Sequence, residues 1–225
     1  MDYQGDDRFN AFLGLLTRID RFGRTYVNYF VRTSFAGQQF AIVRASVDEI
    51  DRLRRKRRPI GLTTWPQILS RAVLKEILIR EMNYIDMTAQ AIAMHRQIPD
   101  DKFRTPWTRD DAKILLAARV FAEDAIPLRD EFLKYCMRET FIDELRALAD
   151  EFEEAIAARR QVTGARPCVE ALIDDAMERG LLTARRLDVM MLNRFYDDNL
   201  GRNEWFMTSH VSYRTGSNAA PGGND

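Results

Sequence analysis

The sequence predicts an all-α protein, a bundle of about six helices, and three features carry this prediction. Apolar residues recur every three or four positions along nearly the whole chain, which is the spacing of one helix face. Strand-like alternation of apolar and polar residues is not sustained, and the β-branched residues are scattered. Proline and glycine divide the chain into segments of helical length.

Helix boundaries follow from proline, glycine and capping residues. Thr108, followed by Asp110 and Asp111, suits a capped helix start, because acidic side chains match the dipole there. Pro127 must kink or break the helix that begins at this point. Gly180 weakens the middle of the last helix by about 1 kcal/mol relative to alanine. Gly37 separates the first predicted helix from the second. The third runs from Pro66 to about residue 97, the fifth over about residues 139–160, and the sixth from Pro167 to about residue 196.

Two parts of the chain, about 100 residues apart, resemble each other. The octet 44–51 aligns with the octet 146–153, and each precedes a basic stretch, a short loop and a long helix opened by Pro66 or Pro167. The sequence therefore predicts a duplicated three-helix unit, residues 1–105 and 106–213, with pseudo-two-fold symmetry. Each unit is too small to bury its own apolar stripes. We therefore expect one domain over residues 1–213, followed by a disordered tail, 214–225.

The composition fits a globular protein whose total charge attracts no particular partner. Hydrophobic residues make up 46% of the chain and charged residues 30%, so a sizeable core can form. The 34 basic and 34 acidic side chains give a formal net charge of zero. Binding to nucleic acid or to an anionic membrane would therefore need a local patch.

A basic run at residues 52–58 is the clearest local patch. It could contact phosphates, but it also ends a helix, where cations complement the dipole and where acidic neighbours precede them. No aromatic interleaving or helix-turn-helix pattern accompanies the run. We favour a solvated helix end, and nucleic acid is not expected as the main partner. The candidate polyanion contacts are Arg54, Arg55, Lys56, Arg57 and Arg58.

No catalytic, cofactor-binding or metal-ligating residue is predicted, and no cofactor is implied. The histidines, His95 and His210, belong to no Glu-x-x-His pair, and the cysteines, Cys136 and Cys168, form no C-x-x-C motif. Phosphate-cradling and nucleophile-elbow motifs are absent from the sequence. The sequence thus favours a non-catalytic role without deciding the question, and we expect two reduced thiols.

The sequence also predicts a location and one contact segment. The acidic N-terminus carries no signal-peptide pattern, and no stretch is apolar enough to span a bilayer. We therefore expect a cytoplasmic protein that does not associate with a membrane. Trp205 and Phe206 follow the last predicted helix. An aromatic segment outside a helix must pack back on the bundle or form a contact site, and we favour packing back.

A set of short stretches in the chain has a familiar pattern: residues 100–104, 115–119, 125–128, 178–181, 185–188, 204–205 and 209–211. In these stretches the sequence resembles a family of uncharacterised bacterial all-helical proteins. The family has no assigned activity, so the resemblance implies a helical fold and leaves the function open.

Four functions therefore compete. We favour an interaction or scaffold protein. It would bind an unknown protein partner, or a second copy of itself, through an exposed helix face. A bundle that binds a small apolar ligand between its helices comes second. Polyanion or nucleic-acid binding through residues 52–58 and an enzymatic activity are further alternatives.

Overall fold

A computed structural model of the chain describes residues 4–30, 34–57, 70–94, 102–162 and 169–211. Every regular element in these ranges is helical and none is a strand, so the predicted all-α class is confirmed. Pro66, Pro167 and the predicted tail, 214–225, lie outside the described residues. The elements are α1 (Gln4–Thr25), α2 (Phe35–Arg57), α3 (Arg71–Ala93), α4 (Asp111–Ala125), η2 (Ile126–Leu128), α5 (Arg129–Lys134), α6 (Phe141–Val162), α7 (Val169–Arg194) and α8 (Asn199–Ser209).

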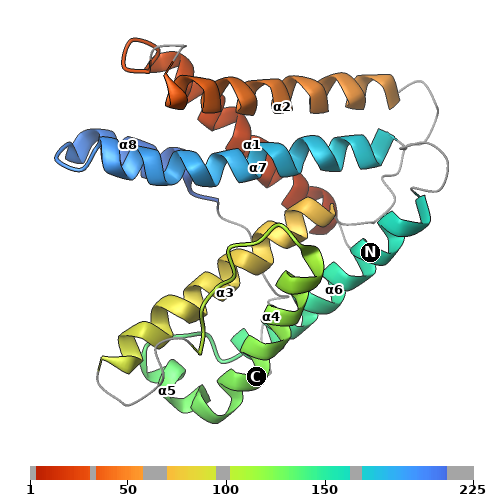
Figure 1. The fold of residues 1–225 in the computed structure, drawn as a ribbon, viewed down its shortest axis with the longest axis vertical. Coiled ribbons are helices and arrows are strands. Elements are labelled where there is room, and N and C mark those ends of the chain that lie inside the picture. Colours follow the sequence, from red (N-terminus) through yellow and green to blue (C-terminus); the bar gives the residue numbers. More distant parts are fainter. Residues whose placement is uncertain (1–3, 31–33, 58–69, 95–101, 163–168, 212–225) are drawn as a thin grey trace, which may run out of the picture.

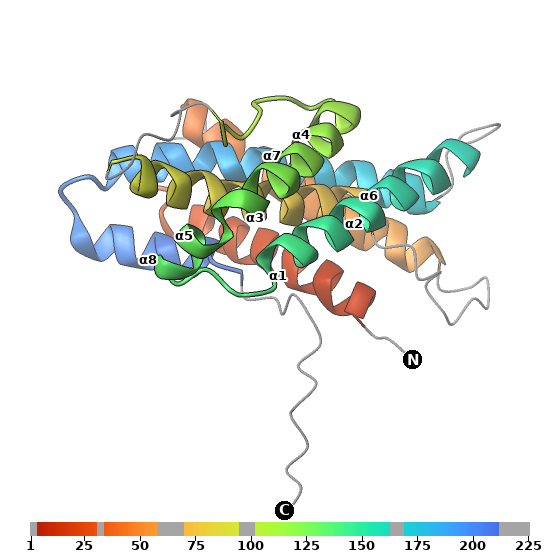
Figure 2. The ribbon, with the colours of Figure 1, turned by 90° about the horizontal axis from the view of Figure 1, so that it is seen from below.

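The helices form two groups that meet at α3 and α7. In the first group α2 lies antiparallel to α7, and α1 packs against both (Figure 1). Figure 2 shows α8 beside α1, at the end of α7. In the second group α6 packs against α3 and α4, and α5 lies at the far end. One cluster of buried apolar side chains runs through both groups.

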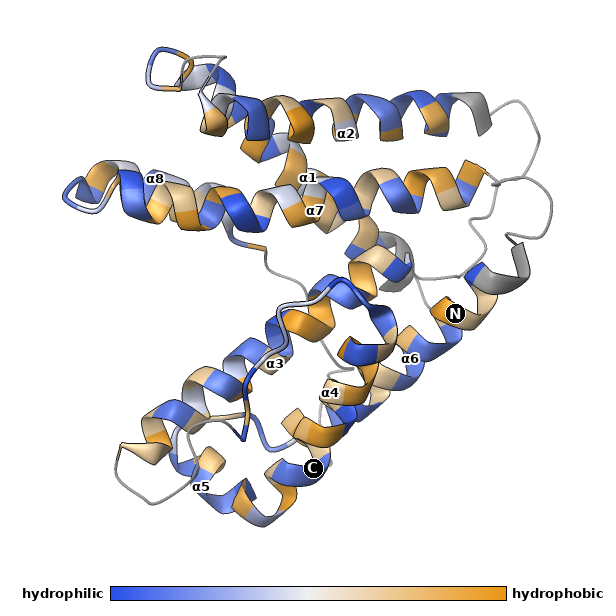
Figure 3. Cartoon of the chain, in the orientation of Figure 1, coloured by the Kyte–Doolittle hydropathy of each residue, from blue (hydrophilic) through white to orange (hydrophobic). Residues whose placement is uncertain are grey.

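The predicted apolar stripes account for this core. On α6 the residues Phe141, Leu145, Leu148 and Phe152 are all buried. Hydrophobic and hydrophilic residues alternate around every long helix, as Figure 3 shows. The amphipathic pattern therefore selects the buried face, as expected for helices whose stability comes from packing.

The observed helix ends agree with one of the predicted boundaries and differ from another. Pro127 lies in the short turn η2, which separates α4 from α5, as its ring requires. The cap predicted at Thr108 is wrong, because α4 begins at Asp111 and the side chain of Asp110 accepts the N–H of Ala112. Thr108 instead accepts the N–H of Asp110, two residues on.

Two short helices were not expected. The first is α5, which follows the break at Pro127. The second is α8, which covers the aromatic segment predicted to lie outside a helix, so that prediction is wrong. Its start is stabilised by Asp198, whose side chain accepts the N–H of Gly201.

Two glycines allow helices to approach each other closely. A Cβ at Gly23 on α1 would lie 2.5 Å from the ring of Phe40 on α2. A Cβ at Gly180 on α7 would lie 2.5 Å from Leu16. By contrast, a Cβ at Gly14 would meet nothing closer than Arg18, at 3.7 Å. The first two positions therefore need glycine for packing, and Gly14 does not.

Alanine substitutions at two glycines of α1 should therefore act in opposite directions. Gly23→Ala should lower the free energy of unfolding by about 1–3 kcal/mol, because Phe40 must move out of a packed core. Gly14→Ala should raise it by up to about 1 kcal/mol, the helix-propensity gain. Urea unfolding of both variants checks this, and effects of the same sign would contradict the helix contact.

Candidate functional site

Charged side chains gather where α3, α4, α6 and α7 meet. Arg71, at the start of α3, is central, since only 7% of its side chain is exposed. Its Nη1 lies 2.7 Å from Asp111 Oδ2, its Nε lies 3.2 Å from Asp174 Oδ2, and its Nη2 contacts Glu178. We call the following set the ionic cluster: Arg71, Lys75, Glu76, Asp111, Arg159, Asp174, Asp175, Glu178 and Arg185.

Asp174 caps α3 from the neighbouring helix α7. Its Oδ1 accepts the backbone N–H of Ala72 at 2.9 Å and the hydroxyl of Ser70. Its Oδ2 accepts from Arg159 Nη1 at 2.7 Å. A carboxylate at a helix N-terminus matches the positive end of the dipole. Asp174 therefore satisfies the start of α3 and joins it to α6 and α7.

The remaining charges of the cluster are also paired. Lys75 Nζ lies 2.9 Å from Glu178 Oε1, 2.8 Å from Asp111 Oδ1 and 2.7 Å from the carbonyl oxygen of Arg109. The carboxylate of Glu76 is buried and accepts from Arg185 Nε at 2.7 Å. These pairs therefore link α3 to α4 and α7.

The pKa shifts of Arg71 and Glu178 keep these two groups charged. Burial alone would lower the pKa of Arg71, but Asp174, Glu178 and Asp111 raise it above its usual range. Burial alone would raise the pKa of Glu178, but Lys75 and Arg71 hold it below its usual range. A general acid or base needs a pKa near the working pH. Neither Arg71 nor Glu178 meets this requirement, so their contacts serve to join helices.

A small pocket lies beside the ionic cluster. Its cavity of about 10 Å³ has room for one water molecule. This pocket therefore cannot accept the small apolar ligand of the second hypothesis. Its lining residues are Leu15, Ile19, Glu76, Arg80, Leu181, Ala184, Arg185, Asp188 and Ser209.

Asp188 in this pocket connects α7 to α8. Its Oδ1 accepts the indole N–H of Trp205 at 3.0 Å. Burial raises the pKa of Asp188, and the nearby charge of Glu76 adds to this rise. The contacts with Trp205, Arg80 and Ser209 lower the pKa, but they do not offset the burial. The ionised form of Asp188 is therefore less favourable in the folded chain than in water.

Asp188→Asn should consequently stabilise the protein at pH 7. A carboxyl whose folded pKa lies above its unfolded pKa binds its proton more tightly when folded, so its ionisation costs stability as the pH rises. Asparagine is neutral and keeps an oxygen that can accept from Trp205. Urea unfolding should give a higher midpoint for the variant at pH 7, and the difference should shrink as the pH falls toward 4. A variant that is less stable at pH 7 would contradict this assignment.

The basic run lies at the end of α2, as predicted. The guanidinium of Arg54 lies over the Phe9 ring, 5.8 Å from its centroid, and Arg52 lies 3.9 Å from Glu49 Oε1. Arg55 is exposed. Lys56 and Arg57 end the helix, but their side chains, like the whole of Arg58, lie outside the described residues. A polyanion contact by this run stays a prediction.

The two predicted contact aromatics have opposite environments on α8. Trp205 is 2% exposed and packs edge-on against Phe22 and Phe40, with ring centroids 5.2 and 6.5 Å apart. Phe206 is 61% exposed, and its ring stacks on His210 at 5.4 Å. Trp205 is therefore part of the core, and only Phe206 remains available for contact.

The described residues provide neither a metal-ligand group nor a membrane-spanning helix. No group of three or more His, Cys, Asp or Glu residues there could hold a metal ion. No helix in the same ranges is long and apolar enough to cross a membrane. Cys136 is exposed in the turn after α5, where its φ of 63° is unusual for a residue with a side chain, and Cys168 lies outside the described residues.

The outer surface of α3 carries a different kind of site. Between residues 83 and 94, every exposed side chain is uncharged. Tyr84, Met87 and Met94 are 54%, 67% and 82% exposed, and Tyr135 extends this surface, since its hydroxyl lies 3.3 Å from the carbonyl oxygen of Ala91. We call the exposed set the α3 face: Asn83, Tyr84, Met87, Gln90 and Met94.

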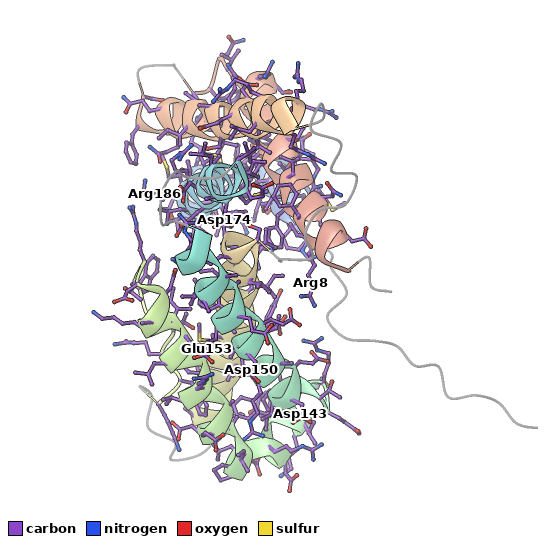
Figure 4. The ribbon with its side chains drawn as sticks, turned by 90° about the vertical axis from the view of Figure 1, so that its right-hand side faces the viewer. Arg8, Asp143, Asp150, Glu153, Asp174 and Arg186 are labelled. Carbon is purple, nitrogen blue, oxygen red and sulfur yellow. The ribbon has the colours of Figure 1, made fainter. Side chains whose placement is uncertain are left out.

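Other exposed helix surfaces carry charges. On α6 the exposed positions include Asp143, Asp150 and Glu153, which Figure 4 shows along this helix. At the end of α7, Val189, Leu192 and Tyr196 are exposed together with Arg186 and Arg194. Among these three surfaces only the α3 face is free of charge, which makes it the best candidate for an apolar contact.

The sequence could not separate the α3 face from the core. Tyr84, Met87 and Met94 follow helical spacing, but so do Ile85 and Ile92, which are buried on the other side of α3. The one sequence feature that could have indicated this face is that residues 87–94 include no charged side chain.

Comparisons with known proteins assign neither the fold nor the site. No protein-family model, curated protein or solved structure matches the chain. The resemblance to uncharacterised bacterial helical proteins therefore stays a prediction.

Proposed function

We propose that the protein is a non-catalytic interaction protein that binds a partner protein, or a second copy of itself, through the α3 face. The observation that carries this proposal is the absence of charge from all five exposed positions between residues 83 and 94, in a chain with 30% charged residues. The core of a protein interface is depleted in charge and enriched in tyrosine and methionine.

The side chains of the α3 face suit an apolar partner surface. Met87 and Met94 have flexible thioether chains that adapt to irregular surfaces. Tyr84 offers a large ring and a hydroxyl, and ordering it costs little conformational entropy. Arg138, 46% exposed and paired with Glu81 on α3, supplies the polar rim that surrounds many interface cores.

A pair of charges on this face should abolish binding and leave the fold intact. Met87→Glu combined with Met94→Glu changes two exposed positions, and surface changes of this kind alter stability by roughly 0.5 kcal/mol or less. Sedimentation of the purified protein would detect self-association, and affinity capture from the producing cells would detect another partner.

The control is a variant with two glutamates on α6. Ala147→Glu combined with Ala157→Glu adds the same charge at exposed positions outside the α3 face. We expect the control to keep every partner that the α3-face variant loses. Equal binding by the wild type and both variants would overturn the proposal.

We also propose that residues 1–105 and 106–213 are a duplicated three-helix unit. The support is that buried positions in the first half have buried counterparts 102 residues later in the second half, as Phe12 has in Ile114. The separation stays at 102 residues along the whole unit, so the alignment needs no gap. The same separation relates the pairs Ile19 and Phe121, Phe30 and Phe132, Val43 and Leu145, Ile50 and Phe152, Ile85 and Leu187, and Ala89 and Met191.

Polar contacts follow the same separation. Asp188 on α7 accepts from Trp205, and its counterpart Asp86 on α3 accepts the N–H of Thr105 at 3.1 Å. Phe103, the counterpart of Trp205, is also buried. In each proposed unit, an aspartate of the third helix thus binds the segment that follows that helix.

A further inference from the structure

We infer that the two halves exchange their third helices: the third helix of each half packs against the first two helices of the other half. We also infer that each half accepts the third helix of the opposite half and not its own. The inference rests on the proposed duplication and concerns a different surface from the α3 face. In Figure 1, α7 of the second half lies along α2, while α3 of the first half lies along α6.

The aromatic residues after each third helix are exchanged too. Phe103, from the first half, packs edge-on against Phe121 and Phe132 of the second, with centroids 5.5 and 5.6 Å apart. Trp205, from the second half, packs against Phe22 and Phe40 of the first. Each half therefore buries one aromatic side chain that follows its third helix in the other half.

Ion pairs between the halves are arranged around this exchange. Arg8 Nη1 lies 2.9 Å from Glu151 Oε2, and Arg138 Nη2 lies 3.0 Å from Glu81 Oε2. The contacts of Arg71, Lys75 and Arg185 in the ionic cluster also cross between the halves. Complementary charges of this kind fix the register of an interface.

The crossing of α3 and α7 has the geometry of a two-fold interface. Near a two-fold axis, a residue contacts its own equivalent in the other unit. Asp174 is separated from Ala72 by 102 residues, and it accepts the backbone N–H of Ala72. The two third helices thus meet at equivalent positions.

Side-chain size makes the pairing specific. A Cβ at Gly180 would lie 2.5 Å from Leu16 and 3.3 Å from Ser46 Cβ. Adding 102 residues to Leu16 and Ser46 gives Ala118 and Leu148, and subtracting 102 from Gly180 gives Leu78. Large and small residues are therefore interchanged between the two helix contacts. A first-half helix in place of α7 would bring the whole Leu78 side chain against Leu16, which would have to move even for a single Cβ at this position. The first half therefore rejects a second copy of itself.

A cut chain tests this interface. The full chain would carry a protease site between Trp107 and Thr108, in the loop where Trp107 is 99% exposed, and would be cut after folding. We expect the two fragments to elute together from a sizing column and to keep the helical spectrum. Gly180→Leu should release the fragments, because its side chain meets Leu16.

The rescue variant makes the test decisive. Leu16→Ala combined with Gly180→Leu copies the Ala118 and Leu78 arrangement and should restore co-elution. The inference is overturned if the unmodified cut fragments separate or unfold. It is also overturned if Gly180→Leu has no effect, or if Leu16→Ala fails to rescue it. The α3-face variant, Met87→Glu with Met94→Glu, should co-elute normally, so failure here is distinct from failure of the proposed function.

Discussion

Phe152→Ala should lower the free energy of unfolding by about 3–5 kcal/mol, because it empties a large aromatic site in a closed core. Phe152 on α6 is completely buried, and its neighbours on the same stripe, Leu145 and Leu148, are buried with it. Urea unfolding followed by circular dichroism would measure the loss.

The matched control is Phe206→Ala on α8. Phe206 is 61% exposed, so its removal should change stability by roughly 0.5 kcal/mol or less. If the free energy of unfolding of Phe152→Ala stayed within about 1 kcal/mol of the wild-type value, well below the range for a buried aromatic, the assigned core face would be wrong.

Arg71→Met should also be destabilising, by up to about 3–5 kcal/mol, the usual effect of removing one partner of a buried ion pair. The substitution would remove the cation that Asp111, Asp174 and Glu178 share. Lys75 would still pair with Asp111 and Glu178, and Arg159 with Asp174. Arg119→Met is the control, because the Arg119 side chain is 46% exposed beside Asp150 and Glu153, and exposed ion pairs contribute little to stability.

The pH dependence provides a second measurement on Arg71→Met. A carboxyl with a lowered folded pKa, such as Glu178, gives stability that is present above its unfolded pKa and lost as the pH falls through its folded pKa. The difference between wild type and Arg71→Met should therefore shrink in acid. A difference that is constant from neutral pH to pH 3 would contradict an electrostatic role.

Local sequence signals predicted the helices because each depends on nearby residues. The stripe on α6 and the break at Pro127 follow from helix periodicity and from the geometry of one ring. The error at α8 has a local cause too, since the cap at Asp198 was not recognised and the aromatic segment was placed outside a helix.

The ionic cluster could not be predicted in this way. Arg71 and Asp174 are 103 residues apart, and each occupies a position that suits a solvated helix surface equally well. Their burial depends on how α3 crosses α7, which local periodicity does not define. The proposed exchange of third helices also depends on this crossing. The matched octets predicted a duplication, but they could not predict which helix would pack against which half.

The most direct test of the interaction proposal is photo-crosslinking from the α3 face. A photoreactive residue would replace Met87 or Met94 in the full chain, with Ala147 or Ala157 on α6 as the control positions, in the cells that produce the protein. The proposal predicts a discrete protein adduct from the α3 face that the control positions do not form. The adduct from position 94 should disappear when Met87→Glu is added. Adducts of equal yield from both helices, or none from the α3 face, would contradict it.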